Sequence, residues 1–302
     1  MMKSTHEITN PPKWTRAIAW LTNPRGLNND KKLRNAVNGK VVLITGASFG
    51  IGEATAQRMA AMGAIVVLVA RSADKLEQVA TAIRATGGKA FTYTIDLSKP
   101  EEAKKLAEDV LRDHGHVDVL INNAGRSIRR SIALSVDRFH DFERTMAINY
   151  LGPVQLVLSL LPSMQARKKG HIVNISTWGV RMPPGARWAA YQASKGAFDT
   201  WLRSVALEIK ADGITTTSIY PAIVYTRMSA PTPGMHSLPG MTTEDAAHVI
   251  ELAVVEKPFE ITPPWLHSWQ IASVILPTPM RKSMEWVFKF TKDSEASSRS
   301  VK

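Results

Sequence analysis

The sequence predicts an α/β fold built on one doubly wound parallel sheet, and three observations support this prediction. Apolar runs of about four to six residues alternate with helical patterns from residue 40 to about residue 255. A glycine-rich turn joins the first apolar run to the first helical pattern. Small and polar residues follow later runs, where a parallel sheet exposes the carboxyl ends of its strands. Five or more strands that alternate with helices imply a sheet covered by helices on both faces.

We expect three segments along the chain. They are an N-terminal extension over residues 1–38, one α/β domain over residues 39–257, and an aromatic and basic C-terminal tail over residues 258–302. In the extension, Trp14, Ala17, Ile18 and Leu21 fall at helical spacing and predict a short amphipathic helix. We expect this helix to pack against the domain or a partner subunit, and a lipid contact is the alternative.

The composition favours a soluble globular protein with an anionic partner. The formal net charge of +12 favours phosphorylated cofactors, coenzyme A or a lipid surface, while dispersed basic residues without a binding motif argue against nucleic acid. The lack of cysteine excludes a disulfide framework, a thiolate zinc site and a cysteine nucleophile, and we expect no metal site. No apolar run reaches about 20 residues and no signal peptide is recognisable, so we expect a cytoplasmic protein without a membrane span.

The first strand and the turn after it predict a dinucleotide site. Residues 41–44 form a buried-strand run, and the turn leads directly into a helical pattern over residues 53–62. Glycines allow the tight turn, and they let a pyrophosphate approach the amides at a helix N-terminus, where the dipole favours negative charge. The candidate cofactor-binding residues here are Gly46, Ser48, Gly50, Ile51 and Gly52.

The next two strands predict where the adenosine half of the cofactor binds. The strand at residues 65–70 ends before Arg71, at a place where an NAD-binding fold offers a carboxylate to the ribose 2′-hydroxyl. A guanidinium fits a 2′-phosphate instead, so we expect NADPH to be preferred over NADH, and a solvated Arg71 is the alternative. The strand at residues 90–95 delivers Asp96 and Leu97, and Asp96 is a candidate acceptor for the adenine amine.

Polar and small residues after the later strands extend the predicted site. The strand at residues 117–121 delivers Asn123, Ala124 and Gly125, which suit the close approach of a nucleotide, although a structural asparagine turn is equally consistent. A long helix at residues 137–165 carries Asn149 in its middle, and a poor helix former there suggests a polar role.

The strand at residues 171–175 leads to Ser176 and Thr177, and the strand at residues 215–220 leads to a turn that crosses the top of the sheet. In this turn we assign Val224 and Thr226 to the cofactor site.

Tyr191 and Lys195 are four residues apart, so a helix places them on one face. A free phenol titrates near pH ~10, and acid or base work near neutrality needs a shift of roughly 3 units, or about 4 kcal/mol. A cation about 4 Å away at an effective dielectric of about 20 supplies energy of that size. We therefore predict that Lys195 lowers the pKa of Tyr191. A surface tyrosine beside a solvated lysine is the alternative.

The tail mixes aromatic residues with cations after a proline-rich loop at residues 231–239 and a predicted helix at residues 243–255. Trp265 and Trp269 lie near its start, and Trp286, Phe288 and Phe290 follow Arg281 and Lys282. Three interpretations stay open: a helix pair on an anionic membrane, a lid over a lipophilic substrate, and packing at an oligomer interface. We expect residues 293–302 to be disordered.

These motifs resemble those of short-chain dehydrogenases/reductases over about residues 38–255. The resemblance rests on Thr45-Gly46-x-x-x-Gly50-x-Gly52, Asn122-Asn123-Ala124-Gly125, Asn149 and Tyr191-x-x-x-Lys195. It implies a Rossmann-type fold, NADP(H) as cofactor and a homo-oligomer. It also implies four roles. Tyr191 is the general acid/base, Lys195 lowers its pKa and holds the nicotinamide ribose, Asn149 supports a proton-relay water, and a Ser/Thr hydroxyl orients the substrate oxygen.

Two positions depart from the pattern of that family. Counting from the preceding strand puts Thr177 at the serine position, while counting back from Gly179 gives Ser176, and we favour Thr177 with Ser176 in reserve. Pro221-Ala222 replaces the usual Pro-Gly, which affects the loop on the nicotinamide side.

Residues 121–130 and 137–149 closely resemble the bacterial short-chain-type fatty acyl-CoA reductases that make long-chain aldehydes. This resemblance implies the NADPH-dependent reduction of a long-chain acyl-CoA. Arg129, Arg130 and the net positive charge are candidates to receive the coenzyme A phosphates, and solvated surface arginines are the alternative. The alternatives are a ketone or secondary alcohol on a lipophilic substrate, and a non-catalytic nucleotide sensor or membrane-associated scaffold.

Overall fold

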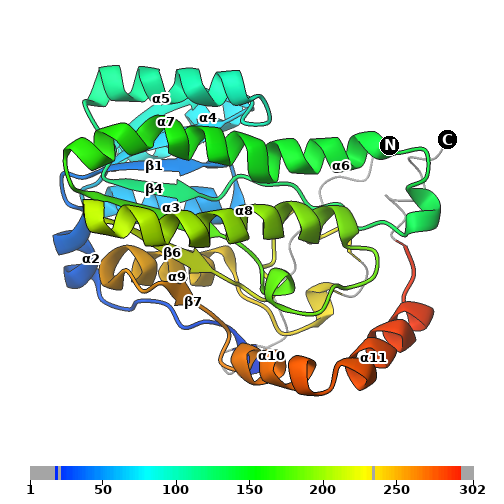
Figure 1. The fold of residues 1–302 in the computed structure, drawn as a ribbon. Coiled ribbons are helices and arrows are strands. Elements are labelled where there is room, and N and C mark those ends of the chain that lie inside the picture. The colour runs from blue at the N-terminus through cyan, green and yellow to red at the C-terminus, as the bar shows by residue number, and fades with distance from the viewer. Residues whose placement is uncertain (1–17, 20–21, 233–234, 294–302) are drawn as a thin grey trace, which may run out of the picture.

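The computed structural model describes residues 18–19, 22–232 and 235–293, and it confirms the predicted parallel sheet (Figure 1). Seven strands pair in the order β3-β2-β1-β4-β5-β6-β7, and all the pairings are parallel. The strands are β1 (Val41–Thr45), β2 (Ile65–Ala70), β3 (Lys89–Thr94), β4 (Val119–Asn122), β5 (Gly170–Ile175), β6 (Ile214–Ile219) and β7 (Glu260–Ile261). The sequence pattern did not predict β7, which has only two residues.

Helices cover both faces of the sheet. On one face lie α3 (Gly50–Ala61), α4 (Ala73–Ala85) and α9 (Thr243–Glu256), and on the other lie α5 (Pro100–His114), α7 (Gly152–Ala166) and α8 (Ala189–Ile209) (Figure 1). Neighbouring strand residues point to opposite faces, so Ile44 and Leu68 join one core while Leu43 and Val67 join the other. Strands β1 and β2 are almost entirely apolar because both of their faces are buried.

The strand order reverses between β1 and β4. The chain runs outward from β1 to β3 and then returns to β4 on the opposite side of β1. Ile44 pairs with both Leu68 and Ile121, so the residues that follow β1, β2 and β4 meet at one edge. Ligands of doubly wound sheets bind in the crevice at this position.

The polar stretch before residue 38 folds as helix α2 (Asp30–Val37), which the sequence pattern did not predict. Asn29 caps the helix by accepting a hydrogen bond from the amide of Lys32 at 2.9 Å. Leu33 and Val37 are buried in the core. Of the residues in the predicted amphipathic helix, Trp14, Ala17 and Leu21 lie outside the described part of the chain.

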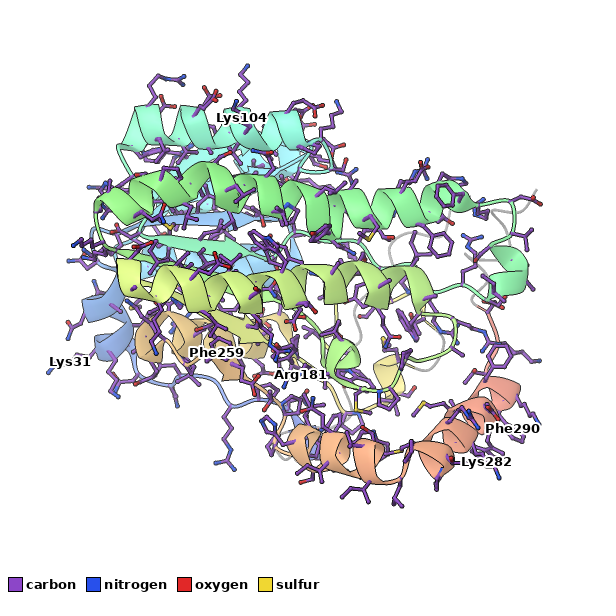
Figure 2. The ribbon with its side chains drawn as sticks, viewed as in Figure 1. Lys31, Lys104, Arg181, Phe259, Lys282 and Phe290 are labelled. Atoms are coloured by element: carbon purple, nitrogen blue, oxygen red, sulfur yellow. The ribbon has the colours of Figure 1, made fainter. Side chains whose placement is uncertain are left out.

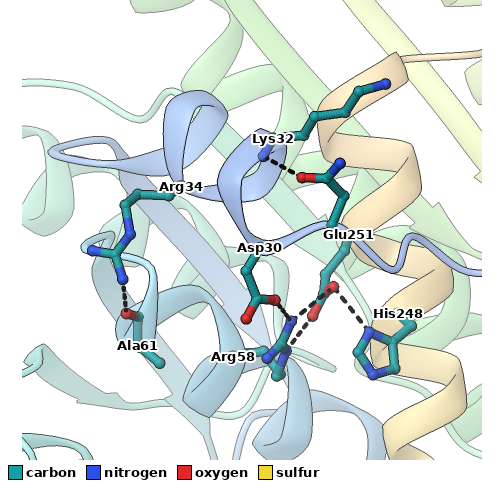
Figure 3. Close-up of polar contacts among 8 residues, drawn as sticks. Asp30, Lys32, Arg34, Arg58, Ala61, His248 and Glu251 are labelled. Atoms are coloured by element: carbon teal, nitrogen blue, oxygen red, sulfur yellow. Dashed lines mark hydrogen bonds and ion pairs between the residues drawn. The ribbon is translucent and has the colours of Figure 1, made fainter.

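An ion-pair cluster joins α2 to the body of the molecule (Figure 3). Arg58 of α3 lies 2.6 Å from Glu251 of α9 and 2.7 Å from Asp30 of α2. His248 of α9 also contacts Glu251, which is fully buried. The cluster compensates the cost of burying a carboxylate, because Glu251 meets two cationic or hydrogen-bonding partners.

The predicted long helix is present, with a π turn inside it. It consists of α6 (Phe139–Met146), the π turn η2 (Ala147–Leu151) and α7. Among the described residues, this helix, Phe139–Ala166, is long and apolar enough to cross a membrane by length and composition, which is weak evidence because core helices pass the same test. Leu156 and Leu160 are buried in the core beside α5 and α8, so we interpret it as a core helix.

The tail after β7 forms α10 (Leu266–Ile275) and α11 (Pro277–Phe290), the orange and red helices at the edge of the molecule in Figure 1. Short 3₁₀ segments are η1 (Ile132–Leu134), η3 (Trp178–Arg181), η4 (Lys210–Asp212) and η5 (Met235–Ser237). Trp265 anchors the start of α10, because its Nε1 donates to the carbonyl of Thr22 at 2.8 Å and its ring meets Trp178 edge to face.

Candidate active site

A cavity of about 520 Å³ opens at the carboxyl edge of the sheet. It is lined by these predicted site residues: Gly46, Gly50, Ile51, Asn123, Ala124, Gly125, Ser176, Thr177, Tyr191, Lys195, Val224 and Thr226. The predicted residues outside its lining are Ser48, Gly52, Arg71, Asp96, Leu97 and Asn149. The fold therefore gathers most of the predicted site around one space, although the segments are far apart in the sequence.

The turn between β1 and α3 has a geometry that fits a phosphate. Gly46 and Gly50 have φ angles of 68° and 65°, which other residues rarely adopt. A Cβ on Gly52 would come within 2.3 Å of the Gly46 carbonyl oxygen. Phe49 precedes α3 without a capping side-chain hydrogen bond, so the first amides of the helix can serve an anionic ligand.

Hydrogen bonds fix the ends of β1 and β4 to each other. Thr45 Oγ1 accepts from the amides of Asn123 at 3.1 Å and Ala124 at 3.0 Å. Asn123 Nδ2 donates to the carbonyls of Thr45 at 3.0 Å and Gly46 at 3.2 Å. The Asn123 side chain thus holds the glycine turn in place, which agrees with the interpretation of this asparagine as a structural turn residue.

Arg71 and Asp96 lie next to each other after β2 and β3. Arg71 Nη1 is 4.0 Å from Asp96 Oδ2, and the arginine side chain is 67% exposed. Asp96 also accepts from Ser98 Oγ at 2.7 Å. Leu97 and Ser48 are both buried. The exposed guanidinium is therefore accessible to a 2′-phosphate, while Leu97 and Ser48 offer a ligand little beyond their backbone.

The π turn η2 places Asn149 against α8. Asn149 Oδ1 accepts from the amide of Arg126 at 2.8 Å, and Nδ2 donates to the Arg126 carbonyl and to Ser194 Oγ, both at 2.9 Å. A Cβ on Gly125 would lie 3.0 Å from Asn149 Oδ1 and 3.2 Å from Lys195 Nζ. Gly125, Asn149 and Lys195 therefore converge, and a larger residue at Gly125 would require Asn149 and Lys195 to shift by a few tenths of an ångström. π turns are rare and often mark functional sites.

Tyr191 and Lys195 share one face of α8 as predicted, but the ammonium group serves a different partner. Lys195 Nζ donates to the carbonyl of Ile175, at the end of β5, at 2.9 Å. Burial lowers the pKa of Lys195 to about 8, and Asp199 acts in the opposite direction. Burial raises the pKa of Tyr191 to about 12, and a hydrogen bond with Thr177 opposes this. Lys195 is not among the groups that shift the pKa of Tyr191 in this structure, so its effect on the phenol stays a prediction.

The two candidate hydroxyl groups face different partners. Thr177 interacts with Tyr191, and its Oγ1 also accepts from the amide of Gly179 at 3.3 Å. Ser176 Oγ is buried and makes no hydrogen bond within the described part of the chain. Burial raises the pKa of the nearby Asp199, and the hydrogen bond from Tyr220 is the largest opposing cause, with Ser176 the smallest. This geometry favours Thr177 as the partner of the phenol.

Asp199 is a site residue that the sequence interpretation missed. It is buried on α8, and its Oδ2 accepts from the Tyr220 hydroxyl at 3.1 Å. Its charge also partly opposes the lowering of the Lys195 pKa by burial. Its position four residues after Lys195 was the available signal, because that spacing continues the face of the helix that carries Tyr191.

Helix α11 covers one side of the cavity. Met284, Val287, Phe288 and Thr291 line the cavity from this side. Arg187 anchors them, because it donates to Thr291 Oγ1 at 2.7 Å and to the Thr291 carbonyl at 2.8 Å. Its guanidinium also lies 4.2 Å from the Phe288 ring centre. These contacts agree with the interpretation of the tail as a lid, and Arg187 carried no sequence signal.

The two arginines considered for coenzyme A differ in the structure. Arg129 lines the cavity and donates to the Lys292 carbonyl at 2.7 Å. Arg130 pairs with Asp141 at 3.4 Å, and its side chain is only 9% exposed. Arg129 is therefore the better placed of the two for an anionic ligand.

Comparisons with known proteins agree with this site. The family model for short chain dehydrogenase matches residues 40–236. The chain is 47% identical over 241 residues to a fatty acyl-CoA reductase of Acinetobacter baylyi, covering 80% of each chain. It is 45% identical over 269 residues to an uncharacterized oxidoreductase of Mycobacterium bovis, covering 88% of this chain and 79% of that protein.

A solved metagenomic short-chain oxidoreductase in complex with NADP superimposes with a TM-score of 0.65 and 32% identity, covering 75% of this chain and 97% of that one. The glycine turn, the exposed Arg71 and the Tyr191–Lys195 pair at the cavity are the features expected of such a protein. The chain therefore belongs to the short-chain dehydrogenase/reductase family and is an NADP(H)-dependent oxidoreductase.

Proposed function

We propose that this protein reduces a long-chain fatty acyl-CoA to the aldehyde in the cytoplasm. The observation that carries the proposal is the 47% identity to the Acinetobacter baylyi fatty acyl-CoA reductase across 80% of both chains. The cavity supports it, because apolar side chains of α11 and Tyr191 line the same cavity. A long alkyl chain is bound well by such apolar walls.

The reaction consumes acyl-CoA, NADPH and a proton, and it releases aldehyde, NADP⁺ and coenzyme A. NADPH supplies the hydride when it is bound. The chain has no cysteine, so it cannot form an acyl-cysteine intermediate, and the thioester carbonyl accepts the hydride directly. The protein must therefore bind the carbonyl oxygen and stabilise the negative charge that develops there.

Tyr191 and Thr177 are the proposed partners of that oxygen. With a pKa of about 12, the Tyr191 phenol is protonated at neutral pH and can donate a hydrogen bond to the carbonyl oxygen. Thr177 interacts with the same phenol and offers a second hydroxyl, with Ser176 in reserve. We assign Asn149 and Lys195 a positioning role, because they fix the segment after β4 and the end of β5.

The residues proposed to hold NADP(H) follow the edge of the sheet. The glycine turn at Gly46, Gly50 and Gly52 would hold the pyrophosphate, and Arg71 the 2′-phosphate. Asp96 would accept from the adenine amine. Val224 and Thr226, which line the cavity after β6, would contact the nicotinamide side of the cofactor.

Incubation with palmitoyl-CoA and NADPH tests the proposal. We expect NADPH loss at the nicotinamide band, with equal amounts of free coenzyme A and aldehyde. Tyr191→Phe should lower kcat by about a thousandfold without changing the affinity for NADPH. Tyr93→Phe is the control, because that hydroxyl bonds Asp113 on α5 and lies outside the cavity.

Other outcomes separate the alternatives. Oxidation of an alcohol with NADP⁺ and no release of coenzyme A would point to a ketone or secondary alcohol on a lipophilic molecule. Tight NADPH binding without turnover of any carbonyl compound would point to a nucleotide sensor or scaffold. We also propose a homo-oligomer from the family, which sedimentation equilibrium tests directly.

A further inference from the structure

Helices α10 and α11 expose a large amount of apolar surface. Within them, Leu266 is buried, and no residue of α11 is buried. On α10, Ile271, Val274 and Ile275 recur at helical spacing and are strongly exposed, with Val274 at 80%. Such a stripe is unusual on a helix that lies on a soluble protein, where the apolar stripe normally faces the core.

The two sides of α11 differ in what they contact. Met284, Val287 and Phe288 line the cavity. Lys282, Trp286, Lys289 and Phe290 recur at four, seven and eight residues and form a separate stripe. The Trp286 and Phe290 rings lie 4.6 Å apart and are 62% and 70% exposed. Figure 2 shows Lys282 and Phe290 on this helix, at the rim of the molecule.

We define the outer roof face by these exposed residues. It consists of Ile271, Val274 and Ile275 on α10 and of Lys282, Trp286, Lys289 and Phe290 on α11.

Charge on these helices is positive. Residues 266–290 contain three cations, Arg281, Lys282 and Lys289, and one acid, Glu285, which gives a net charge of +2 when histidine is neutral. Arg281 pairs with Glu285 at 3.7 Å. The remaining lysines flank the Trp286–Phe290 pair, within a chain that carries a net charge of +12.

We propose that the outer roof face docks on an anionic lipid bilayer. The apolar side chains would enter the boundary between headgroups and acyl chains, and Lys282 and Lys289 would lie at the lipid phosphates. Interfacial helices combine an apolar face rich in Trp, Phe and aliphatic residues with flanking lysines in this way. Tryptophan is also enriched at the boundary between membrane and water.

The charge pattern favours a bilayer over a second copy of this chain. In a symmetric dimer through the outer roof face, each patch meets the same cationic patch on its partner. Lysine is depleted in protein interfaces, whereas each lysine near an anionic bilayer adds about fivefold to the binding constant.

The proposal also assigns a direction of access to the cavity, and this part rests on the proposed function. Helix α11 contributes residues both to the outer roof face and to the cavity wall. A docked protein would therefore hold its cavity next to the bilayer, where long-chain acyl-CoA and the aldehyde product partition.

Co-sedimentation of the full chain with lipid vesicles tests the docking. We compare vesicles of phosphatidylcholine alone with vesicles that also contain phosphatidylglycerol. We expect binding to the anionic vesicles that weakens as salt is raised. Lys282→Gln/Lys289→Gln should reduce the preference for anionic vesicles by about 25-fold, because each lysine contributes about fivefold.

A matched pair of double variants tests the apolar contribution. Val274→Ser/Trp286→Ser removes side chains that are 80% and 62% exposed, and it should weaken vesicle binding by at least about tenfold. Val136→Ser/Phe139→Ser removes side chains that are 75% and 71% exposed elsewhere, and it should leave binding unchanged. Circular dichroism checks that both fold.

Three results would overturn the proposal. The first is that the wild-type chain does not bind anionic vesicles. The second is an equal loss of vesicle binding in the two double variants. The third is a fall in molecular mass for Val274→Ser/Trp286→Ser alone, which would indicate a second copy at this face. Vesicle binding is measured without substrate. A failure here is therefore separate from a failure of the palmitoyl-CoA assay.

Discussion

The glycine turn and the roof helices, α10 and α11, are held in different ways around the cavity, which the turn and α11 both line. The turn is fixed by backbone contacts and by part-buried hydrogen bonds of Thr45 and Asn123. The roof is held by Arg187 and a few contacts near Thr291, and α11 buries none of its residues. The comparison teaches that the cofactor side has little freedom, while the substrate side depends on a few side chains and is where specificity can be adjusted.

Lowering the pH should destabilise the folded protein through His171. We expect this loss of stability to be larger than that caused by any single substitution in α10 or α11. This ring is buried on β5, with Nε2 at 3.1 Å from the Ala253 carbonyl of α9, and burial lowers its pKa to about 4. The unfolded chain has the ordinary value of about 6.5, so it binds a proton in this window that the folded chain does not. The contribution of His171 to the free energy of unfolding is therefore fully present above pH ~6.5. About 3 kcal/mol of it is lost as the pH drops toward ~4.

Urea unfolding at several pH values measures this effect. His171→Gln should show a shallower loss over the same window, while His140→Gln, at an exposed ring, should follow the wild type. Identical slopes in wild type and His171→Gln would show that other groups cause the acid sensitivity.

Gly52→Ala should damage the cofactor side directly. The added methyl would meet the Gly46 carbonyl at 2.3 Å, so we expect a loss of about 2 kcal/mol in stability and weaker NADPH binding. Gly196→Ala is the matched control, because its nearest neighbour would be Val180 Cγ1 at 4.0 Å and α8 should gain up to about 1 kcal/mol. If both variants bind NADPH equally well, the backbone approach at Gly52 is not essential.

Arg71→Ala should change which cofactor is preferred without affecting the roof. Loss of a charge-assisted hydrogen bond to the 2′-phosphate should reduce the ratio of NADPH to NADH affinity by about tenfold. Isothermal titration with both cofactors measures this ratio. Arg84→Ala on α4, which pairs with Glu77 and lies outside the cavity, serves as the control. An unchanged ratio would mean that another residue selects the phosphate.

Arg187→Met should loosen the roof and leave the cofactor side intact. We expect the KM for palmitoyl-CoA to rise about fivefold, because the anchor of Phe288 and Thr291 is lost, with NADPH affinity unchanged. Arg281→Met on the same roof is the control, since that side chain is 72% exposed and pairs only with Glu285 among the ion pairs described. A parallel loss of NADPH affinity would show that roof and turn are coupled.

Much of the cofactor side could be predicted because its signals are local in the sequence. The run at residues 41–44, the glycines after it and Arg71 after β2 each have a fixed relation to a neighbouring strand end. The four-residue spacing of Tyr191 and Lys195 likewise required only a helix. Helix α2 was missed because its sequence is mostly polar, and too few apolar residues, such as Leu33, are present to form a recognisable helical pattern. Strand β7 was missed because two residues are too few for a strand pattern.

The amino-acid sequence by itself determined the order of β1 to β6 and of the helices between them, the glycine turn, the presence of Arg71 after β2 and the face shared by Tyr191 and Lys195. Only the tertiary structure decided that Lys195 donates to Ile175, that Thr177 rather than Ser176 meets the phenol, and that Arg187 fixes α11 over the cavity. The physical reason is range. Periodicity reports contacts within one element, whereas these contacts join residues about 14 to 104 positions apart and depend on how whole elements pack.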